Sequence, residues 1–193
     1  MKIINKLTFA ALAALAVTLL FQTSPTQAGD HGKAAVPSNP FVILLKGTYE
    51  PVVDGPNLGL DSVDLNDGTY SKTQIYRVDG LPGGTDQAVG TFYVQAFRGI
   101  PNPLCAYHVP GGSFTAIFGE RHFVVTPDGT GGLNIVGTVE LEILEGTGIY
   151  RSFVGGHIHM DDVLLHRTGT APNFVFDEYC FCYVSKIEND DDD

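Results

Sequence analysis

The stretch LNIVGTVELEILEGTGIYRSFVGGHIHMDDVLLH, from Leu133 to His166, decides the fold of this chain. Up to residue 143 it alternates strictly between one apolar set and one polar set. The apolar set is Leu133, Ile135, Val139, Leu141 and Ile143. The polar set is Asn134, Thr138, Glu140 and Glu142. A period of two predicts a strand with one buried face, so we expect the apolar set to be buried and both glutamates to be exposed.

The second half of this stretch predicts another long strand. Residues 145–148 read Glu-Gly-Thr-Gly and predict a tight turn, after which an extended run continues to His166. Both runs are longer than the usual strand of about 5–6 residues. Long strands joined by a short glycine turn are typical of a barrel wall.

The rest of the chain reads as short strands separated by glycine and proline turns, without alternating helices. The expected strands are 41–49, 73–79, 88–98, 113–126 (in one piece or broken at Gly119), 132–145, 149–166 and 174–186. Residues 51–71 and 99–112 are expected to be loops. Seven or eight strands of this kind favour an antiparallel barrel or sandwich. We predict one all-β domain over 41–187, a closed eight-stranded antiparallel barrel, because closure removes exposed strand edges.

The N-terminus predicts a secretory signal peptide. Lys2 and Lys6 precede an uncharged apolar run, 9–21, that is too short to span a bilayer of about 30 Å comfortably. We interpret residues 1–28 as a cleaved signal and 29–40 as a flexible leader. The protein is therefore expected to be secreted or periplasmic.

The charge of the remaining chain limits its partners. Without the two lysines of the signal it has nine basic residues against 22 acidic ones. Such a chain should be repelled by nucleic acid and by anionic lipid. No later segment is apolar enough to cross a membrane, so we expect no membrane partner after cleavage. Residues 188–193, Glu-Asn-Asp-Asp-Asp-Asp, are expected to form a disordered acidic tail.

A family resemblance enters at the glycine hairpin. Gly146-Thr147-Gly148-Ile149-Tyr150, followed by Phe153-Val154-Gly155-Gly156, resembles the hairpin of dirigent proteins and allene oxide cyclases. The run Val89 to Val94 is similar to a central strand of those barrels. The resemblance implies an eight-stranded barrel with an apolar lumen, assembled as a trimer or another homo-oligomer such as a dimer. It also implies the guided cyclisation or isomerisation of a small apolar molecule, without a metal or other cofactor.

Two histidines suggest a competing metal hypothesis. His157 and His159 project from the same face of the expected strand, with Cβ atoms roughly 6–7 Å apart. Glu120 or His122 could complete a ligand set. Cupins use such a pair, but they need a glutamate a few residues later and a further histidine motif, and the spacing here does not supply them. We expect purified protein to carry no stoichiometric metal.

Polar side chains within the expected strands are the candidate site residues. Asp161 shares a face with His159 and could orient its imidazole. The candidates for acid or base chemistry are Asp161, Glu120 and His159. The candidates for ligand binding are Arg77, Tyr93, His122, Arg151 and His157. A set of them facing a lumen would indicate a ligand site, whereas each alone fits an exposed position.

The three cysteines leave two arrangements open. Cys180 and Cys182 lie on one face of one strand, too far apart to bond to each other while extended. In an oxidising compartment Cys105 could bridge to either of them, which leaves one thiol over. The alternative is three buried, unpaired thiols.

Three functional hypotheses follow. The first is a secreted barrel that binds a small apolar molecule in its lumen; if it is an enzyme, it is a cofactor-independent cyclase or isomerase. The second is a binding protein of the lipocalin kind without catalysis. The third is a metal-dependent enzyme built on His157 and His159. The first two both require a lumen with room for a ligand.

Overall fold

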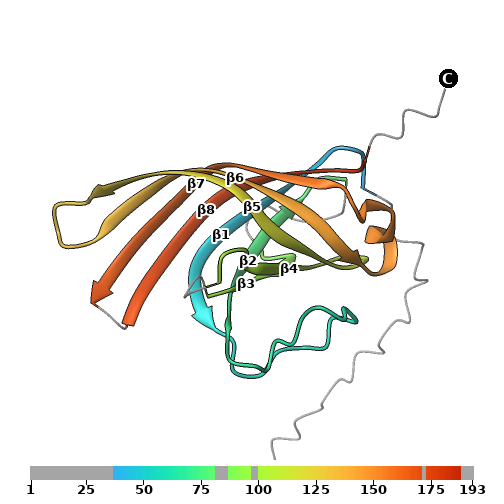
Figure 1. Cartoon of the computed structure of the whole chain (residues 1–193), viewed down its shortest axis with the longest axis horizontal. Coiled ribbons are helices and arrows are strands. Elements are labelled where there is room, and N and C mark those ends of the chain that lie inside the picture. The colour runs from blue at the N-terminus through green and yellow to red at the C-terminus, as the bar shows by residue number, and fades with distance from the viewer. Residues whose placement is uncertain (1–36, 81–86, 97–99, 171–172, 188–193) are drawn as a thin grey trace, which may run out of the picture. The chain divides into compact units, whose positions relative to one another are not determined.

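The computed structural model describes residues 37–80, 87–96, 100–170 and 173–187. Within them, eight strands close into an antiparallel barrel in chain order, as predicted (Figure 1). The strands are β1 (Phe41–Pro51), β2 (Tyr70–Val78), β3 (Gly90–Gln95), β4 (Leu104–Val109), β5 (Gly112–Pro127), β6 (Leu133–Gly146), β7 (His157–Thr170) and β8 (Asn173–Ser185). The expected signal, residues 29–36 of the expected leader and the expected acidic tail lie outside these residues. No helix in the described ranges is long and apolar enough to cross a membrane.

The pairing of β1 with β8 closes the barrel. Phe41 to Thr48 runs in continuous antiparallel register with Val184 to Asp177. Every other neighbouring pair of strands is consecutive in sequence and antiparallel. The first and last strands of the domain therefore complete one closed sheet.

The alternation that predicted β6 is confirmed along the part of the strand next to the turn. The fully buried members of the apolar set are Val139, Leu141 and Ile143. Glu140 and Glu142 are exposed, as expected. Leu133 and Ile135 are only half-buried, because they lie on the start of β6, which extends past the body of the barrel (Figure 1).

Two expected elements were wrong. The eighth strand is β4, in a region expected to be a loop, rather than a second piece of 113–126. The strand expected from residue 149 begins only at His157, because Gly148–Phe153 forms the 3-10 helix η1. Tyr150 and Phe153 of η1 are buried against the end of the barrel, while Arg151 is exposed.

A β-bulge in β7 reverses the faces expected for its second half. The register with β8 shifts between Asp161 and Leu164, and Asp162 takes a positive φ of 50°. An extra residue in one strand turns the following side chains to the opposite face. Leu164 was expected to share a face with Ile158, but it pairs with exposed Tyr179 on the outside of the barrel instead.

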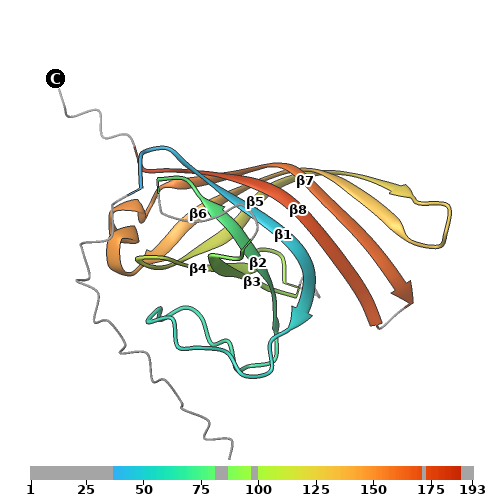
Figure 2. The ribbon, with the colours of Figure 1, turned by 180° about the vertical axis from the view of Figure 1, so that it is seen from behind.

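Beyond the barrel, the ends of four strands form a projecting sheet. The hairpin of β5 and β6 and the hairpin of β7 and β8 extend away from the barrel on the same side, as both views show (Figures 1 and 2). We call this four-stranded part the flange, comprising 119–137 of β5 and β6 and 163–177 of β7 and β8. The pairing of Val136 with Leu164 joins its two hairpins.

The barrel interior is packed with aromatic rings at the end that η1 covers. Phe41 contacts Phe153 edge-on with 5.2 Å between ring centroids. Phe114 lies 5.1 Å from Tyr150 and stacks on Tyr107 at 4.6 Å. All of these side chains are buried. Aromatic pairs in these arrangements stabilise a core beyond the area they bury, so this end of the lumen is filled.

The turn between β6 and η1 depends on a glycine. Gly148 has a φ of +56°, and a Cβ there would lie 1.9 Å from the carbonyl oxygen of Gly111. We predict that Gly148→Ala destabilises the protein by about 2–4 kcal/mol, because backbone must move as well as adopt a strained φ. The measurement is the urea-unfolding free energy.

Gly129 supplies the matched control for this substitution. Its φ of +80° is also left-handed, but no atom lies within 4 Å of the Cβ position. Gly129→Ala should cost only about 1 kcal/mol, the strain alone. Equal losses of unfolding free energy in the two variants would contradict the role of the Gly111 contact.

Candidate functional site

A buried carboxyl group lies inside the barrel at the end that leads into the flange. Glu178 on β8 is 6% exposed, and the hydroxyl of Tyr49 on β1 donates a 2.6 Å hydrogen bond to its Oε2. Glu178 lies on the same face of β8 as Cys180 and Cys182, which belong to the interior core. Its side chain therefore faces the interior.

A second polar group lies close to this carboxyl. Glu178 pairs with Gly47 on β1, and a Cβ on Gly47 would lie 3.2 Å from Oγ1 of Thr73 on β2. The absence of a side chain at Gly47 thus makes room for the Thr73 hydroxyl. Thr73 is buried, and its Oγ1 has no hydrogen-bond partner among the described residues. Buried polar groups are normally satisfied, so a free one beside a buried acid marks a candidate site.

The environment brings the pKa of Glu178 into the physiological range. Burial raises the pKa of this carboxyl to about 7, and the hydrogen bond from Tyr49 opposes the rise. Burial, and after it the charge of Glu178, raises the pKa of Tyr49 well above its ordinary value. At neutral pH the glutamate can therefore give or take a proton while the tyrosine stays protonated.

The three cysteines lie in the same interior as free, buried thiols. The Tyr107 hydroxyl donates to Sγ of Cys182 across 3.8 Å, and Cys105 donates to the Ala116 carbonyl oxygen at 3.4 Å. Burial raises the pKa of the Cys105 thiol well above its ordinary value. A thiol that stays protonated is a poor nucleophile, so the cysteines act as small core residues.

The candidates on β7 lie on the outer wall rather than in the lumen. His157 is exposed and pairs with Glu142, which is also exposed. Nδ1 of His159 forms a short hydrogen bond with the Glu140 carboxylate. Asp161 is half-buried on the same outer face as His159.

The remaining candidates are spread over other parts of the barrel surface. Glu120 and His122 are exposed and bond to each other at 3.0 Å. Arg77 forms an exposed ion pair with Asp79. Tyr93 is buried, but against the loop that covers the outside of β2, β3 and β4 rather than in the lumen. With Arg151 on η1, these side chains do not converge on one site.

The histidine pair lacks a third ligand in this arrangement. Within the described ranges no three His, Cys, Asp or Glu side chains are placed so that they could hold a metal ion. His122 and Glu120, either of which could have completed the set, bond to each other, and His122 pairs with Thr138 of β6.

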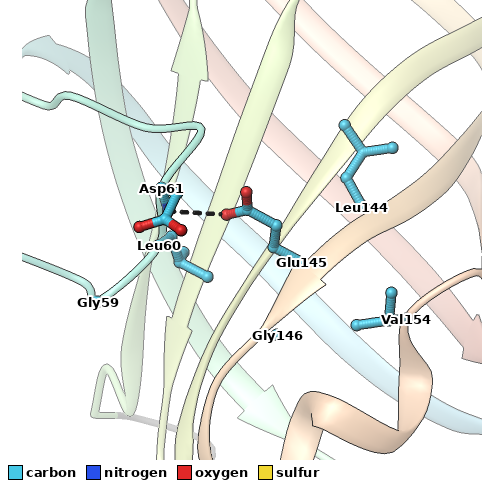
Figure 3. A pocket seen from close by; sticks show the side chains of 7 residues that line it. All are labelled: Gly59, Leu60, Asp61, Leu144, Glu145, Gly146 and Val154. Carbon is cyan, nitrogen blue, oxygen red and sulfur yellow. Dashed lines mark hydrogen bonds between the residues drawn. The ribbon is translucent and has the colours of Figure 1, made fainter.

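Two hollows lie among the described residues, one beside the loop at Gly59–Asp61 and one at the flange. One, of about 320 Å³, lies between Gly59–Asp61 and Leu144–Gly146 (Figure 3). There the Glu145 carboxylate accepts hydrogen bonds from the backbone N–H groups of Asp61 and Ser62, which ties the loop to β6. This carboxylate therefore holds the loop against β6.

The other hollow is a groove of about 560 Å³ on the outer face of the flange. Val136, Leu164 and His166 of the outer face line it, and so do the paired residues Leu165 and Glu178. Glu178 therefore lies beside this groove, although only 6% of the residue is exposed.

Neither Glu178 nor Tyr49 is among the candidates predicted from the sequence. The signal for Glu178 was present, because it has the parity of Cys180, Cys182 and Val184, which are buried. An acidic residue in phase with an apolar face is either paired or functional.

Comparison of the chain with protein-family models, curated proteins and solved structures finds no match in any of the three. The site must therefore be interpreted from its own chemistry.

The raised pKa of Glu178 predicts a specific pH dependence of stability. Between about pH 4.5 and 7 the folded protein binds a proton at this group that the unfolded chain releases, so stability falls as pH rises through this window. Above about pH 7 the penalty is constant, at about 3 kcal/mol. Glu178→Gln should remove this contribution. The measurement is the urea-unfolding free energy at about pH 5 and about pH 8, in both proteins.

The general repulsion among the acidic residues also changes with pH, so a control is required. Glu142→Gln removes an exposed carboxyl from the outer wall. The change in unfolding free energy between about pH 5 and about pH 8 should then stay within about 0.5 kcal/mol of the wild-type change. If Glu178→Gln behaves in the same way, the buried carboxyl does not titrate as described.

The metal hypothesis is tested by elemental analysis of purified protein. We expect no stoichiometric zinc or copper, because the third ligand is missing from the described arrangement. A stoichiometric metal that both His157→Ala and His159→Ala remove would instead support the metal-dependent enzyme.

Proposed function

We propose that this protein binds a small apolar molecule carrying one carbonyl or hydroxyl group, at the flange end of the barrel interior, and transfers a proton on it. The observation that carries the proposal is the buried Glu178 carboxyl with Tyr49 bonded to it and the unpartnered Thr73 hydroxyl close by. The expected signal peptide and the resemblance to allene oxide cyclase-like barrels agree with a secreted protein of this kind.

The energetics favour a functional reason for these groups. Burying a carboxyl and leaving a hydroxyl without a partner both cost free energy, and an apolar residue at either position would avoid that cost. A ligand carbonyl could accept a hydrogen bond from protonated Glu178, and a ligand hydroxyl could bond to Thr73. The ligand would then supply the partners that the folded chain lacks.

The packing of the barrel interior favours this end, because aromatic side chains fill the other one. The rings of Phe41 and Phe153 and of their aromatic neighbours occupy the interior next to η1. Around Glu178 the neighbours on the adjoining strands are Gly47, which has no side chain, and half-buried Leu165. Leu165 and Glu178 both line the groove at the flange, so a ligand would enter from that end.

The reaction class that suits one carboxyl of this kind is isomerisation. Ionised Glu178 removes a proton from the carbon between a carbonyl and a double bond, and the electron pair of that C–H bond moves into a dienolate. The protonated glutamate then returns the proton to the far carbon of the dienolate, which shifts the double bond. Tyr49 orients the carboxyl through its hydrogen bond, and no oxidant or cofactor takes part.

Binding without chemistry is the alternative, and the same contacts support it. A lipocalin-like protein would need the apolar walls and the hydrogen bonds, but not the proton transfer. The two functions differ in whether Glu178 must ionise.

Binding is tested with β-ionone, an apolar ketone, by calorimetric titration at about pH 6, where Glu178 is mostly protonated. We expect Glu178→Leu to weaken binding at least about tenfold, because the hydrogen bond is lost. Glu178→Gln, which keeps a donor, should stay within about tenfold of wild type. Failure of wild type to bind this probe or a panel of similar ketones would refute the proposed site.

Turnover is tested with 3-cyclohexen-1-one, whose conversion to the conjugated ketone is followed by ultraviolet absorbance. We expect Glu178→Gln to lower the rate at least about 100-fold, as for loss of a general base. Glu142→Gln, on the outer wall, should leave it unchanged. Binding of the ketone without turnover by wild type would establish the binding protein and exclude the isomerase for this substrate class.

A further inference from the structure

Strand β5 continues well beyond the strand that pairs with its outer edge. It runs over 16 residues, Gly112–Pro127, but β4 pairs with it only from Gly112 to Ile117. From Arg121 to Pro127, β5 is paired with β6 along the edge that does not face β4. Among the described residues no strand pairs with the edge of Arg121–Pro127 that lies on the β4 side of the strand. The closed barrel therefore opens into a free strand edge on the flange.

The exposed segment of β5 has the composition of a strand that pairs. Phe123, Val124 and Val125 are consecutive and are 39%, 67% and 53% exposed. They alternate between the two faces of the flange, so both faces of this edge are apolar. Lysine, proline or a covering element usually guards such an edge, but 122–126 contains no lysine and no proline.

The charge of the flange favours a second copy of this chain as the partner. The whole chain has 22 acidic and 11 basic residues, so most of its surface repels another copy. From Gly119 to Gly137 the charged residues are Glu120, Arg121 and Asp128, and the Asp128 carboxylate is bonded to His166. Two copies that approach through this hairpin meet little repulsion.

We propose that two copies of the protein pair antiparallel through residues 122–126 of β5, across a two-fold axis, and form a dimer. The two four-stranded flanges then become one eight-stranded sheet, and each free edge supplies the backbone groups that the other needs. Residues that lie directly opposite each other in an antiparallel pair point to the same face of the sheet. Even-numbered residues of one copy must therefore face even-numbered residues of the other. Val124 then lies near the axis, opposite Val124 of the second copy, and Phe123 lies opposite its Val125.

This geometry differs from the trimer that the family resemblance implies. It uses a strand edge, and a two-fold axis closes after two copies. The proposal is independent of the ligand site, because it rests on the unpaired edge and the exposed side chains of β5 and not on the Glu178 carboxyl.

The test uses sedimentation velocity of the purified protein with charge substitutions at the axis. Val124→Lys and Val124→Glu each place like charges opposite each other, and each should weaken the dimer at least about tenfold. An equimolar mixture of the two variants should recover the dimer, because opposite charges then face each other. Val124 is 67% exposed, so neither substitution should disturb folding.

Two further variants separate edge pairing from other associations. Val53→Lys, at a loop position that is 91% exposed, should leave the dimer unchanged. Leu164→Lys lies on the outer face of β7, which is an inner strand of the flange, and should weaken the dimer less than Val124→Lys does. A monomer at about 100 μM wild-type protein, a trimer, or a dimer that Leu164→Lys dissociates and Val124→Lys does not would each overturn the proposal.

Discussion

The continuous pairing of β1 with β8 is the constraint on which the rest of this structure depends. It joins the first and last strands of the domain, from Phe41 opposite Val184 to Thr48 opposite Asp177. Because side chains alternate between the two faces of a strand, this single register decides which residues of both strands lie inside. It places Ile43 and Cys182 in the core and brings Glu178 beside Gly47. A shift of one residue would expose the core positions of both strands.

The closed interior then divides into regions of different chemistry. Aromatic rings fill the end next to η1, and the thiols of Cys105 and Cys182 lie in the same apolar core. The carboxyl of Glu178 lies at the flange end, where Gly47 makes room for the Thr73 hydroxyl. A protein that used its interior only for stability would gain by continuing the apolar packing to both ends. The cost of this acidic end is the physical reason to seek function there rather than among the histidines of the outer wall.

The sequence was sufficient for the architecture but not for the site. Strict alternation identified β6, where one face meets the core and the other meets water. It could not identify β4, because Ala106 is buried under a loop on the outside while Cys105 and Tyr107 are buried inside, so the strand shows no alternation. Nor could it locate the bulge after Asp161, because the positive φ at Asp162 leaves no mark on the apolar and polar pattern. The polar residues that stand out in sequence are those on the solvent side, which is why the candidates from β7 lie outside the lumen.

Unequal strand lengths connect the barrel to the flange. β3 and β4 have six residues each, whereas β5 to β8 have between 13 and 16. The short strands fix the height of the closed barrel, and the extra length of the long strands must leave it as an open sheet. Closure removes strand edges only where every strand has two neighbours, so the same chain that closes its barrel recreates an edge along the end of β5. The hydrophobic residues Phe123, Val124 and Val125 lie at that edge, far from the core that their composition would suit. The long strands thus place Glu178 where the barrel meets the flange. They also leave residues 122–126 of β5 without a neighbouring strand on one edge.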